Sequence, residues 1–387
     1  MREYKLAAPQ SAAEEKVYAL IAGIEPADRE AMRQARERQD SRLKVPGSLG
    51  RLEDIGVRLA GMTGKVTGND VRRQAVIIMS ADNGVVEEGV ASAPQTVTLM
   101  QTINFTRRIT GIGSQAAYFG IDILDIDCGV ALPIPEECLT KDMLTAEGRL
   151  AEKVVDRRIA NGTRNLAKEP AMTREQAIEA FLIGFEAADA VKAAGIRLAG
   201  VGEMGIGNST TGACLISALT GAKAAAVIGR GGGLDDEGLG KKAKVVDDAV
   251  AKYACDDPIE MARCMGGFDI CAMAGAYLGL ARHRIPTVID GYISIAGALL
   301  AKAICPTVTD YMFTSHRSEE QGYALAAAEI GIPPMFDLGM KLGEASGCPI
   351  AFKIIEAGTA IIDRMKSLAE GQIDHRYLDE LRERKFL

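Results

Sequence analysis

One acidic residue, Glu344, stands in the glycine-rich turn that ends the segment LGMKLGEASG, residues 338–347. The next segment, CPIAFKIIEAGTAIIDRMKSL, predicts a helix, because Pro349 falls in its first turn, where the missing N–H of proline is tolerated. We therefore expect Glu344 in a loop between a strand end and a helix start, where open α/β sheets carry active-site residues. A carboxylate there can accept a proton; the alternative is a loop acid that only contacts solvent.

Two further glycine-rich segments have the features of anion-binding turns. GEMGIGNSTTG, residues 202–212, follows an apolar run and precedes a helical pattern, and helix N-termini reached through glycine attract phosphate. IGRGGGLDDEGLGKK, residues 228–242, repeats the pattern and adds Arg230 and Lys241 as cationic partners. The alternatives are helix–sheet packing for the first turn and a solvated acidic helix start for the second. Together the two turns indicate one phosphorylated ligand that spans neighbouring strand ends.

Polar residues also follow three other predicted strands, in SADNGVVEEG, DGYIS and TSHRSEE. The carboxyl ends of parallel strands meet at one edge of a sheet, so these loops should join the glycine turns there. The candidate site residues that they supply are Asp82, Asn83, Glu88, Asp290, Ser315 and Ser318, with His316 expected to line the site rather than act as a catalyst. Neither a Ser/His/Asp order nor a reactive-cysteine context accompanies them. The chemistry that they permit is binding, orientation and one proton transfer.

The composition argues against several classes of function. With 387 residues, 48% apolar and 25% charged, the chain can bury a large core as one big domain or two unequal ones. The net charge of -7 disfavours nucleic acid or an anionic membrane as the main partner. The eight cysteines form no CxxC and only three histidines occur, so we expect reduced thiols and no metal site. Without a signal-peptide core or an apolar run of about 18 residues, we expect a cytoplasmic protein with no membrane span.

The elements that must position these residues alternate between strands and helices. Seven β-rich segments each run into a Gly, Asp or Ser cluster: AVIIMSADNG, IDILDIDCGV, RLAGVGEMGIG, AAAVIGRGGG, TVIDGY, YMFTSH and MFDLGM. Among the helical patterns between them, one opens with a capping-box pattern at Thr173 and Gln176 and stops at Gly195. This alternation predicts an α/β fold, a doubly wound and mainly parallel sheet with helices on both faces.

The two chain ends differ from the middle, because they read as charged or amphipathic helices with no strand before Ala75. We expect residues 1–70 and 348–387 to form the two parts of a small helical lobe, and residues 71–347 to form the large catalytic α/β domain. The segment 136–168 is polar and poorly periodic, which predicts an excursion from the sheet.

Eight motifs, taken in order, carry a family resemblance: KVPGSLGRLE, SADNGV, GEMGIGNSTTG, GRGGGLDDEGL, GGFDICAMAGA, DGYISIAGALLA, SHRSEEQGY and LGMKLGEASG. They span Lys44–Gly347, and the chain closely resembles the nicotinate-nucleotide:dimethylbenzimidazole phosphoribosyltransferase family. The resemblance implies an enzyme that transfers phosphoribosyl from nicotinate mononucleotide to dimethylbenzimidazole or a related lower-ligand base. The products are nicotinate and the α-linked ribotide used in the nucleotide loop of cobamides such as cobalamin. No cofactor and no metal are implied.

The resemblance also assigns roles to residues. It makes Glu344 the general base, with Glu203 nearby as a second acid. The donor phosphate and ribose should lie against Gly205, Gly207, Gly229, Arg230, Gly231, Lys241, Asp290 and Ser318. The acceptor base should contact Ser80, Asp82, Asn83, Glu88, Met204 and Leu342.

Four positions depart from the family pattern: Asn83 replaces His, Ala93 an aromatic residue, Gly232 a Thr and Ala345 a Gly. Most of these positions belong to substrate pockets, so the identity of the acceptor base stays open. The alternative is a phenol- or cresol-accepting relative, or one subunit of a heterodimer of similar chains. We expect a homodimer or such a heterodimer. A nicotinamide dehydrogenase is disfavoured because the third glycine of its G-x-G-x-x-G turn is missing. A non-catalytic partner subunit would be marked by loss of the acid, and Glu344 is retained.

Overall fold

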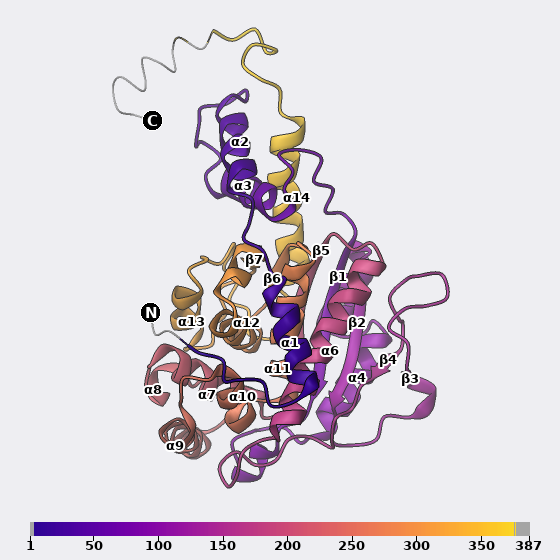
Figure 1. The fold of residues 1–387 in the computed structure, drawn as a ribbon, viewed down its shortest axis with the longest axis vertical. Coiled ribbons are helices and arrows are strands. Elements are labelled where there is room, and N and C mark those ends of the chain that lie inside the picture. Colours follow the sequence, from indigo (N-terminus) through magenta and orange to yellow (C-terminus); the bar gives the residue numbers. More distant parts are fainter. Residues whose placement is uncertain (1–3, 375, 377–387) are drawn as a thin grey trace.

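A seven-stranded parallel sheet forms the centre of the computed structural model, which describes residues 4–374 and 376 (Figure 1). The strand order is β3-β4-β2-β1-β5-β6-β7, and every pair of neighbours is parallel. The strands are β1 (Gln74–Ala81), β2 (Asp122–Gly129), β3 (Leu139–Thr140), β4 (Val154–Asp156), β5 (Leu198–Met204), β6 (Thr287–Ile289) and β7 (Met312–Thr314). Because β2 and β5 flank β1 on opposite sides, the winding direction reverses between β1 and β5. A crevice is expected at their carboxyl ends.

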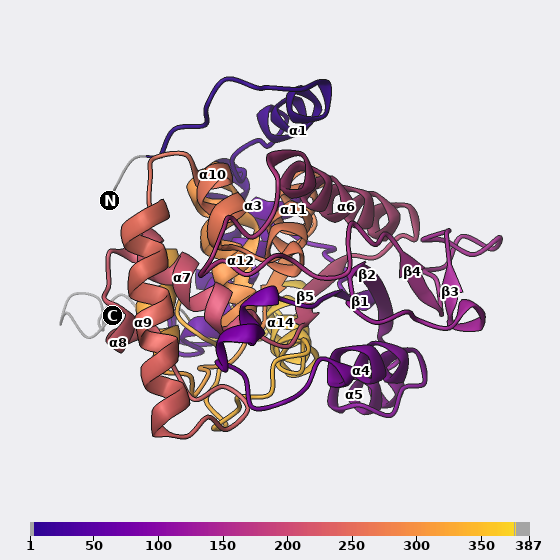
Figure 2. The same ribbon diagram turned by 90° about the horizontal axis from the view of Figure 1, so that it is seen from below.

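Helices cover both faces of the sheet, as Figure 2 shows from below. One face carries α6 (Arg174–Ala193), α11 (Phe268–Arg282) and α12 (Tyr292–Ile304). The other carries α4 (Thr96–Thr106), α5 (Gly111–Phe119) and α14 (Cys348–Arg364). The central strand β1 is buried along its whole length, as a strand covered on two faces should be. The predicted doubly wound α/β fold is confirmed.

Two glycines allow α6 and α11 to pack closely. A β-carbon on Gly184 would lie 2.1 Å from the carbonyl oxygen of Ala272, and one on Gly275 would lie 2.1 Å from that of Phe181. Helix α6 begins with the predicted capping box at Thr173, which fixes where the helix enters this contact.

The remaining helices surround the carboxyl edge of the sheet or belong to the chain ends. Near that edge lie α7 (Asn208–Thr220), α8 (Ala224–Val227), α9 (Asp236–Tyr253), α10 (Pro258–Met265) and α13 (Tyr323–Ile330). Short 3-10 helices occur at η1 (Gly84–Glu88), η2 (Glu136–Cys138) and η3 (Pro306–Tyr311). The N-terminal region contains α1 (Ala12–Ala22), α2 (Arg29–Asp40) and α3 (Arg51–Thr63).

Helices α2, α3 and α14 form a small cluster of their own, whose apolar centre is Ala35, Val57, Ala60 and Ile362. Helix α1 instead packs against α6 and α11 on the large sheet (Figure 1). The boundaries 1–70, 71–347 and 348–387 stay a prediction, and most of the chain after residue 374 lies outside the described residues.

Three local predictions were wrong. The alanine-rich run before Arg230 forms the single helical turn α8 rather than a strand, because alanine strongly favours helix. The segment MFDLGM forms no strand beyond one bridge between His316 and Phe336, since it follows Pro333 and Pro334, which lack the N–H groups of a ladder. The supposed excursion 136–168 contributes β3 and β4 to the sheet edge.

Candidate active site

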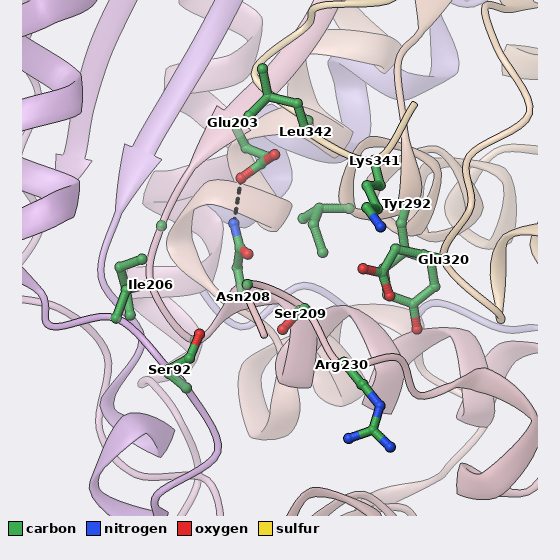
Figure 3. A pocket seen from close by; sticks show the side chains of 18 of the residues that line it. Ser92, Glu203, Ile206, Asn208, Ser209, Arg230, Tyr292, Glu320, Lys341 and Leu342 are labelled. Carbon is green, nitrogen blue, oxygen red and sulfur yellow. Dashed lines mark hydrogen bonds between the residues drawn. The ribbon is translucent and has the colours of Figure 1, made fainter. Parts of the chain in front are cut away.

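A cavity of 290 Å³ opens at the carboxyl ends of β1 and β5, where the winding direction reverses (Figure 3). Its wall combines the loop after η1, the β5–α7 turn, the glycine turn after α8, the start of α12, and the loops before α13 and α14. The loop after η1, the β5–α7 turn and the start of α12 follow the neighbouring strands β1, β5 and β6. The cavity therefore lies where the fold predicts a ligand.

The turn that carries Glu344 has an uncommon backbone. Gly343, Glu344 and Ala345 have φ angles of 83°, 58° and 58°, in the left-handed region that costs a non-glycine residue about 1–2 kcal/mol. Two buried carboxylates hold this turn. Glu203 accepts the backbone N–H of Glu344, and Asp290 accepts those of Ala345 and Gly347, the latter at 2.7 Å.

The sheet is shaped to receive this turn. A β-carbon on Gly202 of β5 would lie 2.4 Å from the backbone nitrogen of Ala345. Only a strand residue without a side chain allows such an approach. The glycine that begins the GEM motif therefore makes room for the Glu344 turn rather than for phosphate.

The Glu344 carboxylate is buried, with 6% of the residue exposed. Its Oε1 accepts a hydrogen bond of 2.7 Å from Nε2 of Gln101 on α4. Its Oε2 has no partner within the described chain, although the residue lines the cavity. Burial raises the pKa of Glu344, which makes its carboxylate a stronger base than a surface glutamate.

A second buried acid lies beside the base. Nδ2 of Asn208 donates to Oε2 of Glu203 at 2.5 Å, as Figure 3 shows. It also donates to Oδ2 of Asp269 at 3.1 Å. Burial raises the pKa of both acids to about 7, and the nearby charge of Glu344 contributes to the shift at Glu203. Glu203 can therefore exchange a proton near neutral pH.

The β5–α7 turn presents backbone to the cavity. Gly207, with φ of 95°, is the N-cap of α7, and a β-carbon on Gly205 would lie 2.1 Å from the carbonyl oxygen of Ala81. Both glycines are therefore required by conformation or by close packing against β1. The N-terminus of α7 faces the cavity through Asn208 and Ser209 and can hold an anion.

A buried cation supports the second glycine turn. Nζ of Lys242 donates to Oγ of Ser209 at 2.9 Å and to the carbonyl oxygen of Gly229 at 3.1 Å. Burial lowers the pKa of Lys242 to about 8. The residue chosen from sequence, Lys241, is exposed and pairs with Glu237 at 2.8 Å. The helical period of α9 offered the signal, since Gly238, Lys242, Val245 and Ala249 form its buried face.

Other predicted residues fall into two groups. Those that line the cavity are Glu203, Met204, Gly205, Gly207, Arg230, Gly231, Ser318, Leu342 and Glu344. Arg230 points away from the centre of the cavity (Figure 3). It donates to the carbonyl oxygen of Leu234 at 2.9 Å and to Asp236 at 2.5 Å. Those that the structure does not bring to the wall are Ser80, Asp82, Asn83, Glu88, Gly229, Lys241, Asp290 and Ser315.

The residues outside the wall have structural partners. Ser80 donates to Asp125 at 3.1 Å, and Asp82 accepts from Thr98 at 2.7 Å and from the backbone of Ala131 at 2.8 Å. Asn83 accepts from Thr211 at 3.4 Å, and Glu88 accepts from Asn165 at 2.6 Å. Ser315 donates to the carbonyl oxygen of Asp290 at 2.9 Å, behind the Glu344 turn. His316 is buried there too, and burial lowers its pKa to about 4, so it is neutral.

The sequence interpretation missed several residues of the wall, namely Ser92, Asn208, Ser209, Tyr292, Glu320 and Lys341. Most of them lie inside the motifs that the sequence indicated, so the motifs were right but the residues expected to line the cavity were incomplete. Among residues 4–374, no group of three or more His, Cys, Asp or Glu side chains is arranged to hold a metal ion. Within the same part of the chain, no helix is both long and apolar enough to cross a membrane.

Comparisons with known proteins agree with this geometry. Residues 24–373 match the DBI_PRT phosphoribosyltransferase family model. The chain is 46% identical to a nicotinate-nucleotide–dimethylbenzimidazole phosphoribosyltransferase of Clostridium perfringens, over 94% of this chain and 97% of that protein. It is 40% identical to the protein of the same name from Geobacter metallireducens, over 92% of this chain and 97% of that one.

A solved structure of the nicotinate-nucleotide–dimethylbenzimidazole phosphoribosyltransferase of Thermus thermophilus is similar as well. It is 36% identical and matches with a TM-score of 0.82, covering 90% of this chain and 99% of that one. Sequence, fold and the family model thus agree over nearly the whole length, and the chain belongs to the DBI_PRT family of phosphoribosyltransferases.

Proposed function

We propose that this enzyme transfers phosphoribosyl from nicotinate mononucleotide to dimethylbenzimidazole or a related aromatic base, for cobamide nucleotide-loop assembly. One observation carries the proposal. Glu344, buried and raised in pKa, lines a cavity whose other end is built from glycine turns with the buried Lys242 behind them, and its Oε2 has no hydrogen-bond partner among the described residues. A base and an anion site on one cavity suit the transfer of a phosphorylated sugar to a group that loses a proton.

The chemistry requires only one proton acceptor. The bond between C1′ of ribose and the positively charged ring nitrogen breaks, and its electron pair neutralises that nitrogen, so nicotinate leaves without an acid. A ring nitrogen of the acceptor attacks C1′ from the opposite face, which gives the α-linked product. The N–H on the other ring nitrogen of the acceptor then becomes acidic, and its proton passes to the carboxylate of Glu344. Glu203 holds the turn and can take the proton onward.

The donor phosphate is assigned to the glycine turns. The N-terminus of α7 at Gly207 and the turn around Gly231 offer backbone N–H groups, and Lys242 supplies a charge from beneath. Lys242 takes the role first given to Lys241. Arg230 remains a candidate, provided that it leaves Asp236 when the donor binds.

The acceptor is assigned to the side of Met204 and Leu342, near Ala93. Of the two departures expected to alter this pocket, Ala93 lines the cavity and Asn83 does not. The smaller side chain at position 93 supports a roomy acceptor slot, so phenols such as p-cresol are retained as competing acceptors.

Association with a second copy of this chain, or with a similar chain, belongs to the same proposal. Helices α4 and α5, side by side in Figure 2, and their connection expose Met100, Ile109 and Tyr118, the last with 84% of its surface accessible. Large exposed apolar side chains are typical of protein interfaces. Helix α4 also carries Gln101, so an interface there would adjoin the base. Light scattering of the purified protein tests whether it is a dimer.

We propose the cytoplasm as the location of the enzyme.

The decisive experiment uses the purified chain alone. Nicotinate mononucleotide and dimethylbenzimidazole are incubated with it, and nicotinate and the ribotide are measured by mass spectrometry. We expect both products in equal amounts, and their absence with every aromatic acceptor tried would overturn the proposal. Activity only after addition of a similar chain would favour the heterodimer.

A further inference from the structure

A second cavity, of 590 Å³, lies at the opposite edge of the sheet from the active site. It adjoins the amino ends of β1, β5 and β6, and its wall includes the connection from α3 to β1, which Figure 1 shows passing from the cluster of α2, α3 and α14 to the sheet. Strand β1 has eight residues, so about 25 Å separates the two edges. Small-ligand sites commonly have volumes of about 300–1,000 Å³, so this cavity can hold a ligand of its own.

Cations dominate the wall of this second cavity, although the chain as a whole carries a net charge of -7. The basic residues are Lys65, Arg73, Lys192, Arg197, His283 and Arg284. Arg284 pairs with Glu25 at 3.6 Å, and His283 pairs with Asp189 at 2.5 Å. The side chains of the other four form no ion pair and no hydrogen bond among the described residues. Four positive charges of this wall are therefore left without a partner.

The described residues contribute one carboxylate to the wall, that of Asp70, and it is already engaged. Arg72 binds both of its oxygens, at 2.8 and 2.6 Å. Arg72 and, from farther away, Arg197 lower the pKa of Asp70, so this carboxylate stays ionised. Its single charge cannot neutralise the wall.

Helix ends explain only part of the positive charge. Lys192 lies in the last turn of α6 and Lys65 follows the C-terminus of α3, where cations compensate the partial negative charge of a helix end. Arg73 and Arg197 instead precede β1 and β5. The backbone N–H of Arg197 donates to the carbonyl oxygen of Arg73 at 2.8 Å, so the two arginines stand side by side on neighbouring strands. Like charges in this position repel each other, and an anion bound between them removes the repulsion.

We propose that this cavity is a second anion site, which binds the polyphosphate group of a nucleotide or of inorganic triphosphate between Arg73 and Arg197. Each guanidinium can donate two parallel hydrogen bonds to phosphate oxygens, which an ammonium cannot. Lys65 and Lys192 add positive charge on the same wall. A single phosphate would meet only part of this charge, whereas a chain of phosphates can contact several of the cations at once. The inference does not depend on the transfer reaction.

Calorimetry of the purified chain with inorganic triphosphate and with ATP tests the site. We expect Arg73→Gln and Arg197→Gln each to weaken triphosphate binding about 10-fold, and the double variant to weaken it further. Lys192→Gln, at an exposed helix position, should cause a smaller loss without any risk to folding. Similar affinity for the two ligands assigns the site to the polyphosphate group alone, and tighter binding of ATP adds its nucleoside. Both outcomes support the inference.

Two control variants make the result specific. Lys242→Met alters the active-site cavity and should leave triphosphate binding at the second cavity unchanged. Arg33→Gln removes an exposed arginine of α2 that pairs with Glu30, outside both cavities, and should change nothing. Transfer activity and thermal melting of the two arginine variants should match those of the unmodified chain. The inference is overturned by absence of triphosphate binding at millimolar concentration, by equal affinity for sulfate, or by full affinity in the double arginine variant.

Discussion

The two ends of the cavity are held in different ways. At the base end, buried Glu203 and Asp290 bind the backbone of the Glu344 turn, and Gln101 holds one oxygen of its carboxylate. At the donor end, the turn after Arg230 contains the exposed glycines Gly232 and Gly233. The base is thus fixed before substrate arrives. The donor end instead presents backbone N–H groups of a glycine turn, with the buried ammonium of Lys242 behind them. A base must be placed to within a fraction of an ångström, while a phosphate can organise the groups that bind it.

Removing the base should produce the largest effect. In Glu344→Gln the shape is kept and the amide can still meet Gln101, but no proton can be accepted. We expect kcat to fall by about 10²-fold or more, with little change in donor affinity. Steady-state kinetics with mass detection and donor calorimetry measure the two quantities. Unchanged turnover would contradict the assignment and direct attention to Glu203.

Removing the buried charge should affect the donor end. Lys242→Met leaves the turn without its cation, and KM for nicotinate mononucleotide should rise by about 10–100-fold, with little change in the affinity for the free acceptor base. Lys241→Met is the matched control, since that side chain is exposed and pairs with Glu237. A loss of donor affinity in Lys241→Met with none in Lys242→Met would contradict this assignment and favour Lys241. Thermal melting separates loss of binding from loss of folding.

Glu344 and Lys242 should give the reaction opposite pH dependences. The active form of Glu344 is the carboxylate, and its pKa is raised by burial, so activity should fall as pH drops through that raised pKa. The active form of Lys242 is the ammonium, whose pKa is lowered to about 8, so donor binding should weaken above that pH. A bell-shaped kcat/KM profile follows, with each limb approaching about tenfold per pH unit. Lys242→Arg keeps the charge at high pH and should remove the alkaline limb.

The sequence predicted the base end better than the donor end, for a physical reason. Glu344 stands alone in its motif, so recognising the motif selected the residue. The adjacent Lys241 and Lys242 differ only by the face of α9 on which they fall, and the glycine motif alone does not distinguish the two faces. The link from Gln101 to Glu344 joins residues 243 positions apart and has no local signal.

The elements of the fold also differed in how well the sequence predicted them. Long apolar strands such as β1 and β5 were predicted because periodicity and length agree there. Short apolar runs were ambiguous: the segment at Ala224–Val227 became a helical turn, while the polar region 136–168 supplied the edge strand β3 and its neighbour β4. Strands of two or three residues are set by their neighbours in the sheet rather than by their own composition.

The smallest effect should come from the acceptor wall, at Ala93. Its side chain lines the cavity, and Ala93→Phe would restore the aromatic residue of the family pattern and narrow the slot. A contact with one ring changes selectivity by about 1–3 kcal/mol at most, so we expect a shift of several fold toward dimethylbenzimidazole over p-cresol and adenine, with kcat for dimethylbenzimidazole preserved. Competition among equal concentrations of the three acceptors, with products identified by mass, measures the shift. Asn83→His is the informative comparison, because Asn83 lies behind the wall and bonds to Thr211, so that substitution should disturb packing without changing acceptor preference.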